Sequence, residues 1–470
     1  MKEYKYNIVA KNIAEEILPK LQLNDLLPTS TELCTRYDIS EITINKALKI
    51  LVERGFVKRI QSKGTILVKY PESLWESQPV QQVHLSVLGI PTQSWNFMAA
   101  FEHFLDRFCA LNPHVSYQVN HCFPNEYPER IKNEKFDLIL VNIWTLRELL
   151  TTPSLVKCFL PIDKIPGLIY DEKTYFPGVL KWCRNGERLF CLPVTNSTIF
   201  QKTNLDYLGM SKTPFNQETS WDNFVNVLRT AKKNNSLKSP LFYMRHENHY
   251  WPVMLKILGG YIFSRDGKKC LLDSSELITA VKKLYELVAD ERLFVSSTSN
   301  ENSEGQKNTI DWFKAGTLAC SWDSGLFLEN SYDFNCSYDP LPYGKHKANH
   351  LMIEGVMIDG STAHRETVRD VLNFLQTAGS LEFFRHCTGV SSQKYFARTY
   401  IDKLKPTHQG IQTILDSLNC AEPIIPAPRL NVCNYIAQKL NMILLGIIPL
   451  EKACREIAAE ANLMLEKEEF

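Results

Sequence analysis

The sequence predicts an α/β protein that begins with a winged helix-turn-helix domain and continues into a larger domain. Residues 27–65 contain two helical patterns, a short break between them and two strand-like segments after them. From Val83 onward, strand-like and helix-like segments alternate, which is typical of a parallel α/β sheet. The segment between these parts contains prolines and polar residues and is predicted to be a linker. The predicted boundaries are residues 1–70, 71–82 and 83–470.

The two helical patterns carry start and stop signals. Thr29 and Glu32 form a capping-box pair, which predicts a helix that begins at Pro28–Ser30. Ser40 is predicted to be the N-cap of the second helix, whose apolar positions recur at spacings of three and four. Gly55 is predicted to end that helix. The second helix of such a unit fits the major groove of DNA.

A basic hairpin, the wing, follows the second helix. Phe56–Ile60 and Thr65–Val68 are strand-like and are joined by Gln61–Gly64. The predicted DNA contacts are Thr29, Ser40, Ile42, Thr43, Asn45, Lys46, Lys49, Lys63 and Gly64. Ile42 is expected either to meet a thymine methyl group or to pack on the neighbouring helix. Lys63 either contacts DNA at the wing tip or is a solvated turn lysine.

The first 70 or so residues resemble the N-terminal domain of the GntR (gluconate-repressor) family of bacterial transcription regulators. The resemblance rests on three motifs: LPT followed by EL, DIS-x-x-TI-x-x-AL-x-x-L, and G-F-x-x-x-x-x-x-K-G-T. It implies that these residues bind operator DNA. The family usually has arginines where this chain has Thr31, Glu41 and Asn45, so these positions weaken or retarget DNA binding. The alternative is a winged helix that serves as a protein-interaction module.

The distribution of charge agrees with DNA binding near the N-terminus. The whole chain has a formal net charge of only +1. Residues 1–70 contain 12 Lys and Arg against 8 Asp and Glu, whereas the rest contains 41 against 44. The basic surplus is modest, but it lies on the predicted DNA-binding domain.

Other classes of function find no support in the sequence. Early charges leave no room for an apolar signal core, and no run of about 18 apolar residues occurs, so we expect a cytoplasmic protein without a membrane partner. The 13 cysteines lack metal-finger spacing and are expected to be free thiols. His246 and His249 have no third ligand nearby and are expected to be surface residues. No nucleotide-binding or hydrolase motif occurs, so we expect no enzyme activity, no cofactor and no metal.

Conspicuous residues follow two strands of the predicted sheet. Trp95 follows the strand pattern Val83–Leu88, and Asn142 and Trp144 follow the buried strand pattern Phe136–Val141. Ligands of parallel α/β sheets bind beyond the carboxyl ends of the strands. The sequence therefore predicts a ligand site at this edge.

The segment from Val83 to the C-terminus resembles bacterial extracellular solute-binding proteins of the carbohydrate-uptake type. The motifs that carry the resemblance follow the family's order: FLDRFCALNPHVSYQV, FDLILVN, FLPID, NGERLFCLPVTNSTIFQKTNLDYLGM, SWDNFVNVLRTAKK and WFKAGTLACSWDSG. It implies a two-lobed, periplasmic-binding-protein-like (type II) domain that closes on a small solute. The alternative is a sensor of the sugar-repressor (type I) kind, whose lobes are joined by different crossovers.

Sugars stack on aromatic rings and pair their hydroxyls with carboxylates or amides. The candidate ligand-binding residues are Trp95, Asn142, Trp144, Tyr250, Trp251, Trp322, Asp323 and Glu354. For each aromatic residue, packing in a core or lobe interface is the alternative. For Asp323 and Glu354, the alternative is a position on the solvated surface or in a salt bridge between the lobes.

Together these features predict a cytoplasmic homodimer that binds double-stranded operator DNA and a small-molecule effector, expected to be a sugar or oligosaccharide. Effector binding is expected to change DNA affinity through differential binding to two conformations. The alternative is a solute receptor with an attached adaptor module.

Overall fold

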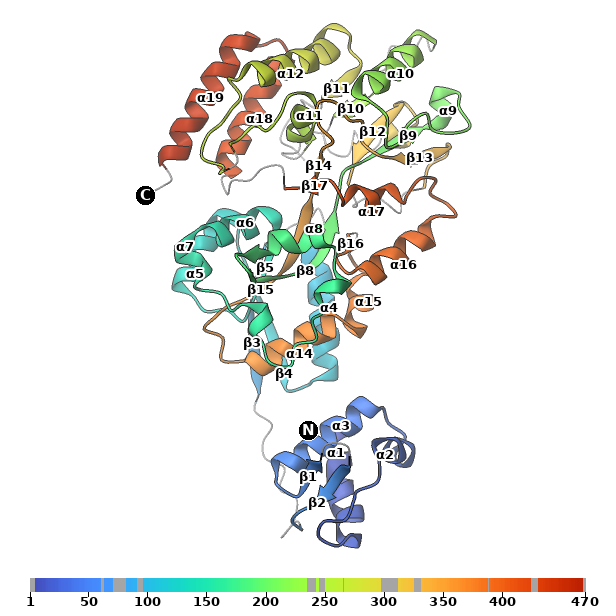
Figure 1. Ribbon diagram of the computed structural model, residues 1–470, viewed down its shortest axis with the longest axis vertical. Coiled ribbons are helices and arrows are strands. Elements are labelled where there is room, and N and C mark those ends of the chain that lie inside the picture. Colours follow the sequence, from blue (N-terminus) through green and yellow to red (C-terminus); the bar gives the residue numbers. More distant parts are fainter. Residues whose placement is uncertain are drawn as a thin grey trace. The chain divides into compact units, whose positions relative to one another are not determined.

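The structure is a computed structural model in which the chain forms two compact units, Met1–Gln81 and Gln82–Phe470. Each unit is described by itself (Figure 1). The structure describes residues 5–60, 63–70, 82–90, 96–234, 242–244, 250–264, 266–296, 312–324, 331–387, 389–423 and 430–467.

The first unit is a winged helix-turn-helix. Its elements are α1 (Lys5–Asn12), the single turns η1 (Ile13–Ile17) and η2 (Leu18–Lys20), α2 (Ser30–Tyr37), α3 (Glu41–Glu53), β1 (Val57–Ile60) and β2 (Gly64–Leu67). β1 and β2 pair antiparallel to form the wing. The core is apolar and is formed by one face of each helix, with Ile13, Leu33, Ile44 and Leu51 fully buried. This confirms the predicted winged helix fold.

The predicted capping residues are found at the starts of α2 and α3. Thr29 Oγ1 accepts a hydrogen bond from the Glu32 amide at 3.3 Å, and the Glu32 carboxylate accepts one from the Thr29 amide at 2.8 Å. Ser40 caps α3 by accepting a bond from the Thr43 amide. Gly55 follows α3 with φ of +71°, a conformation that favours glycine.

The second unit has two lobes, and lobe 1 is built on a six-stranded sheet of order β16-β8-β15-β5-β3-β4. β3 runs parallel to β4 and β5, whereas β15 lies antiparallel between β5 and β8. The parallel part is the predicted α/β sheet. The strands are β3 (Val83–Gly89), β4 (Val115–His121), β5 (Leu138–Asn142), β8 (Cys191–Ser197), β15 (Met352–Ile358) and β16 (Val390–Ser391).

Helices cover both faces of the lobe 1 sheet. The chain passes from β3 to β4 through α4 (Phe97–Leu111) and back across the sheet to β5 through α5 (Tyr127–Asn133). Right-handed crossovers in opposite directions put these helices on opposite faces, as Figure 1 shows. α14 (Arg365–Leu375) and α15 (Ala378–Phe383) pack beside α4. The remaining lobe 1 elements are α6 (Ile143–Thr151), α7 (Pro153–Val156), α8 (Pro177–Leu180), α16 (Lys394–Leu404), and the hairpin β6 (Arg184–Asn185) with β7 (Arg188–Leu189).

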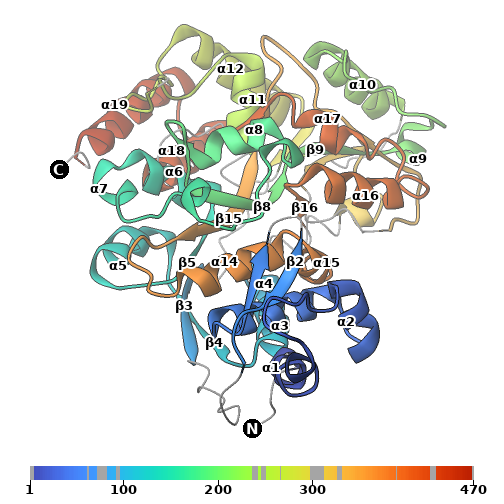
Figure 2. The same ribbon diagram turned by 60° about the horizontal axis from the view of Figure 1, so that its bottom comes forward.

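Lobe 2 is built on a five-stranded sheet of order β11-β10-β12-β9-β13 with its own apolar core. Its strands are β9 (Phe200–Asn204), β10 (Phe242–Met244), β11 (Phe294–Ser296), β12 (Cys320–Asp323) and β13 (Cys336–Asp339). Its helices are α9 (Leu205–Leu208), α10 (Trp221–Asn234), α11 (Tyr250–Leu258), α12 (Ser275–Tyr285), α18 (Leu430–Leu444) and α19 (Leu450–Lys467). The C-terminal pair α18 and α19 lies beside α12 in Figure 1 and Figure 2.

Two connections between the lobes are described in full and a third is described as far as residue 423, and together these segments form the hinge. The first runs from β8 to β9. The second returns from β13 through β14 (Asn349–His350) to β15, and the third leaves α17 (Thr413–Ser417) through β17 (Ala421–Glu422) for α18. β14 and β17 pair in parallel. The Asn349 side chain donates to the Ile199 carbonyl at 2.6 Å and accepts from the Ile199 amide at 2.8 Å, so it ties the first connection to the second.

Among the helices that the structure describes, none combines the length and the apolar character that crossing a membrane requires. In the whole described part of the chain, no three His, Cys, Asp or Glu side chains are grouped so that they could hold a metal ion. His246 and His249 lie outside the described residues.

Candidate functional site

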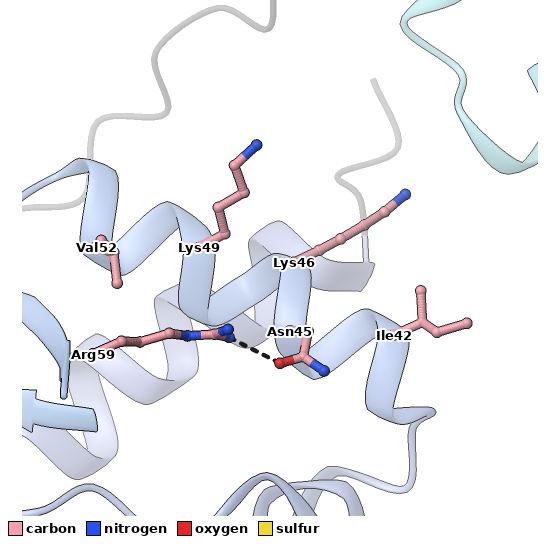
Figure 3. A pocket seen from close by; sticks show the side chains of 6 residues that line it. All are labelled: Ile42, Asn45, Lys46, Lys49, Val52 and Arg59. Carbon is pink, nitrogen blue, oxygen red and sulfur yellow. Dashed lines mark hydrogen bonds between the residues drawn. The ribbon is translucent and has the colours of Figure 1, made fainter. Parts of the chain in front are cut away.

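The outer face of α3 carries a groove of about 470 Å³ (Figure 3). Five of its residues lie on α3 at helical spacings, and the sixth comes from the wing strand β1. The opposite face of α3 is buried in the core of the domain. The groove residues are Ile42, Asn45, Lys46, Lys49, Val52 and Arg59.

Four predicted DNA contacts therefore share this surface, which we call the α3 groove. Ile42 is 72% exposed, so it projects from the helix instead of packing on a neighbouring one. The Lys46 and Lys49 side chains are directed away from the helix in Figure 3. Lys49 lies 3.6 Å from Glu53, but both side chains are about 60% exposed, so this pair contributes little stability.

Arg59 belongs to the same groove, although the sequence analysis did not single it out. Its guanidinium donates a hydrogen bond of 2.8 Å to Asn45 Oδ1, which links the wing to α3 (Figure 3). The wing thus adds a third positive charge to the groove, beside Asn45. The available signal was the position of Arg59 in the first wing strand, immediately after the helix.

The other predicted DNA contacts lie at helix caps and at the wing. Thr29 and Ser40 use their hydroxyl groups in the caps described above, and the Thr43 hydroxyl lies 2.9 Å from that of Ser40. Lys63 and Gly64 are exposed where β2 begins. Gly64 has φ of +117°, and a Cβ there would lie 3.1 Å from Leu26, so the turn favours glycine.

The second candidate site is a cavity of about 60 Å³ that lies where β5, β8 and β15 approach the hinge. Glu354 pairs with Asn142 on one side and with Thr195 on the other, which brings three distant segments together. Trp144 packs against the cores of both lobes and stacks on His350 of the hinge at 5.1 Å between ring centroids. The lining residues are Asn142, Ile143, Trp144, Thr195, Asn196, Ser197, Met352, Ile353 and Glu354.

Glu354 is the ionisable residue of this cavity, which we call the hinge cavity. Its side chain is almost fully buried, and burial raises its pKa to about 8. The Thr195 hydroxyl donates to the carboxylate at 3.3 Å, which opposes the rise. The site therefore holds a carboxyl group whose charge changes near neutral pH.

The structure places four other predicted ligand residues in lobe 2, away from the hinge cavity. Tyr250, Trp251 and Trp322 are buried in the apolar core, and Trp322 Nε1 donates to Gln201 at 3.3 Å. Asp323 forms a buried ion pair with Lys202 at 2.6 Å. The three aromatic residues thus pack in the lobe 2 core, and the Asp323 ion pair lies within lobe 2, between adjacent strands of its sheet. Trp95 lies outside the described residues.

Sequence reasoning missed Thr195, Asn196 and His350 as neighbours of the predicted site. Thr195 and Asn196 lie on β8, which approaches Asn142 through the antiparallel pairing of both β8 and β5 with β15. His350 lies on the hinge strand β14 and meets Trp144 by ring stacking. The signal that was available is the polar run Thr195–Thr198 at the end of an apolar strand.

The two units define a class of protein: a winged helix domain joined to a two-lobed domain. Residues 5–67 match the model of the family described as bacterial regulatory proteins, gntR family. Over 46 residues the chain is 54% identical to the uncharacterized HTH-type transcriptional regulator YurK of Bacillus subtilis (strain 168), which is 10% of this chain and 19% of that protein. Over 85 residues it is 36% identical to the probable fructoselysine utilization operon transcriptional repressor of Escherichia coli (strain K12), covering 18% of this chain and 32% of that protein.

The chain thus spans less than a third of the length of these curated relatives. The rest of the chain resembles solved sugar-binding proteins. The substrate-binding protein Lmo0181 of Listeria monocytogenes, in complex with cycloalternan, has a TM-score of 0.64 and 14% identity, covering 82% of this chain and 100% of that chain. Maltose-bound MalE3 of T. maritima has a TM-score of 0.63 and 14% identity, covering 81% and 100%. The N-terminal domain is therefore a GntR-type winged helix, and the rest has the two-lobed fold of sugar-binding solute-binding proteins.

Proposed function

We propose that this protein is a ligand-responsive transcription regulator of the cytoplasm. Residues 1–70 bind operator DNA, residues 71–82 link the domains, and residues 83–470 bind a small solute, a sugar or oligosaccharide, between two lobes. One chain combines two features that support the proposal. The first is a GntR-type winged helix with a basic groove, and the second is a solute-binding fold with a cavity lined in part by Asn142 and Glu354. The protein acts without catalysis, cofactor or metal.

In the proposed mechanism, binding of the solute affects binding of DNA through a change in conformation. A solute that binds the closed sensor better than the open one shifts the population toward closure, and DNA affinity changes only if the two states present the winged helices differently. A homodimer that reads a two-fold site meets this requirement, because its two recognition helices must match the spacing of the half-sites.

The proposal is tested by selection of duplexes from a random DNA library with the full chain, followed by a thermal-shift screen of saccharides. We expect enrichment of a two-fold motif and stabilisation by a subset of saccharides, since a ligand that binds the folded state raises its melting temperature. No enrichment over random DNA, with or without a stabilising saccharide, would refute the regulator. Binding of a partner protein by the winged helix would then favour the alternative, in which this domain is a protein-interaction module.

Lys46→Ala combined with Lys49→Ala is expected to weaken DNA binding by the same factor for all sequences. Each lysine that neutralises a phosphate contributes about one unit to the slope of log K against log salt, so the slope should fall by about two units. Fluorescence anisotropy across a salt series measures this. Lys132→Ala, which removes an exposed lysine of α5, is the matched control and should leave the slope unchanged. Equal slopes in both variants would contradict phosphate contact by the α3 groove.

Arg59→Ala is expected to relax sequence preference without a comparable loss of salt dependence. Its guanidinium is held at the groove by Asn45, in a position to read a base edge. Loss of an arginine that contacts guanine costs about 1–3 kcal/mol at that base pair. Repeating the duplex selection with the variant shows whether one position of the motif becomes degenerate. An unchanged motif would exclude base reading by Arg59.

A further inference from the structure

Two side-chain donors that line the hinge cavity are already bonded to acceptors within the chain. The Thr195 hydroxyl donates to Glu354, and Asn196 Nδ2 donates to the Ser391 carbonyl at 3.0 Å. These donors are therefore used, while the Glu354 carboxylate and Asn196 Oδ1 retain acceptor capacity. Asn142 is the exception: its Oδ1 accepts from the Thr145 amide at 3.0 Å, so its amide NH₂ is left as a donor.

Glu354 lacks a compensating cation in the described part of the chain. Its one hydrogen bond there comes from Thr195, and none of the ion pairs formed by described residues includes it. The buried thiol of Cys387, whose pKa is raised by burial and by Glu354, brings no positive charge to the carboxylate. A buried carboxylate without a counter-charge is unfavourable, so a ligand that supplies a cation gains the interaction that the protein leaves open.

The size of the cavity limits what enters it. A cavity of about 60 Å³ has room for a small substituent, whereas sites that enclose a whole small molecule have volumes of roughly 300–1,000 Å³. Trp144 lines the cavity and presents an aromatic surface, which attracts cations. The cavity therefore fits one small polar group of a larger ligand.

We infer that the effector carries a primary ammonium group that enters the hinge cavity and pairs with Glu354. The chemical class is an aminated saccharide: the ammonium meets Glu354, Asn196 Oδ1 and the Trp144 ring, and a hydroxyl group next to it accepts from the Asn142 amide. This inference rests on the proposed function and narrows its ligand class. A neutral sugar would offer a hydroxyl group in place of the ammonium and would gain no ion pair with Glu354.

The test compares matched sugars on the full-length protein at pH 7.5. D-Glucose and 6-amino-6-deoxy-D-glucose differ in one substituent, and D-glucosamine and N-acetyl-D-glucosamine differ in the charge on nitrogen. Titration followed by tryptophan fluorescence, with thermal shift as a second readout, gives the ratio of affinities within each pair. We expect at least tenfold preference for the cationic member of at least one pair.

Glu354→Gln keeps the shape of the side chain and removes the charge, so the preference should fall to about one while the circular dichroism spectrum stays unchanged. Glu129→Gln, at an exposed acid of α5, is the matched control and should retain the preference. If neutral and cationic sugars bind equally well, the inference is overturned and the saccharide regulator stands. If the preference persists in Glu354→Gln, the ammonium site is elsewhere and the inference is also overturned. If no saccharide of either kind binds, both the inference and the proposed ligand class fail.

Discussion

Asp323→Asn is expected to lower the free energy of unfolding of the two-lobed unit by about 3–5 kcal/mol. The Asp323 and Lys202 side chains are 7% and 4% exposed and lie 2.6 Å apart on adjacent strands, β12 and β9. Lys202 also donates to the Tyr332 hydroxyl at 2.9 Å. Burial alone would lower the pKa of Lys202, but Asp323 raises it above its ordinary value. Loss of the carboxylate leaves a buried ammonium without its counter-charge.

Urea unfolding followed by tryptophan fluorescence measures this effect, because Trp322 precedes Asp323 in β12. Asp163→Asn is the matched control: it breaks a partly exposed ion pair with Arg188 at 3.1 Å and should cost less than about 1 kcal/mol. Adding Lys202→Met to Asp323→Asn should recover part of the stability, since removing both charges leaves neither unpaired. Equal losses in the two single variants would contradict a structural ion pair.

The Glu354 carboxyl group is expected to make the two-lobed unit less stable as the pH rises from about 4.5 to 8, and Glu354→Gln should remove this contribution. Burial raises the pKa of Glu354 in the folded state from 4.5 to about 8. Between these values the folded state binds more protons than the unfolded state, so raising the pH favours unfolding. The stabilisation is complete below about pH 4.5 and is lost as the pH passes through about 8, with an upper limit of about 5 kcal/mol.

Melting temperatures of the wild type and Glu354→Gln from pH 5 to 9 test this prediction. The difference between the two proteins isolates the one carboxyl group, since every other titrating group is common to both. Cys387, the ionisable neighbour, has a pKa raised by burial and by Glu354, so it stays neutral over this range. Parallel curves would show that Glu354 is ionised or solvated in the folded protein.

The N-terminal domain could be predicted from sequence because its signals are local. The capping pair Thr29 and Glu32, the cap Ser40 and the glycine after α3 lie within a few residues of the helix ends that they set. Arg59 was missed because its partner Asn45 is 14 residues away and meets it only when the wing folds back. Local chemistry fixes the elements, and tertiary structure decides which side chains meet.

The ligand site was predicted less completely, for the same reason. Asn142 and Trp144 follow one strand end, and Glu354 joins them through the antiparallel pair β5 and β15. Trp322 and Asp323 also follow a strand-like run, yet β12 lies inside the lobe 2 sheet and buries both residues. An aromatic residue beside a carboxylate looks the same in sequence whether it lines a cavity or packs in a core. Asp323 would be read correctly only with knowledge of Lys202, 121 residues earlier in the chain.

The chain enters the two-lobed unit at Val83, the amino end of β3, whereas the hinge cavity lies at the carboxyl end of the neighbouring strand β5. In the proposed mechanism, closure of lobe 2 about Asn349 therefore acts at the other end of the lobe 1 sheet from the point where the chain enters. Under that mechanism, a signal from the effector would leave through a surface of lobe 2, such as a face that meets the second subunit of the proposed homodimer. Changing the length of the tether should then alter which operator spacings are tolerated far more than it alters the response to effector.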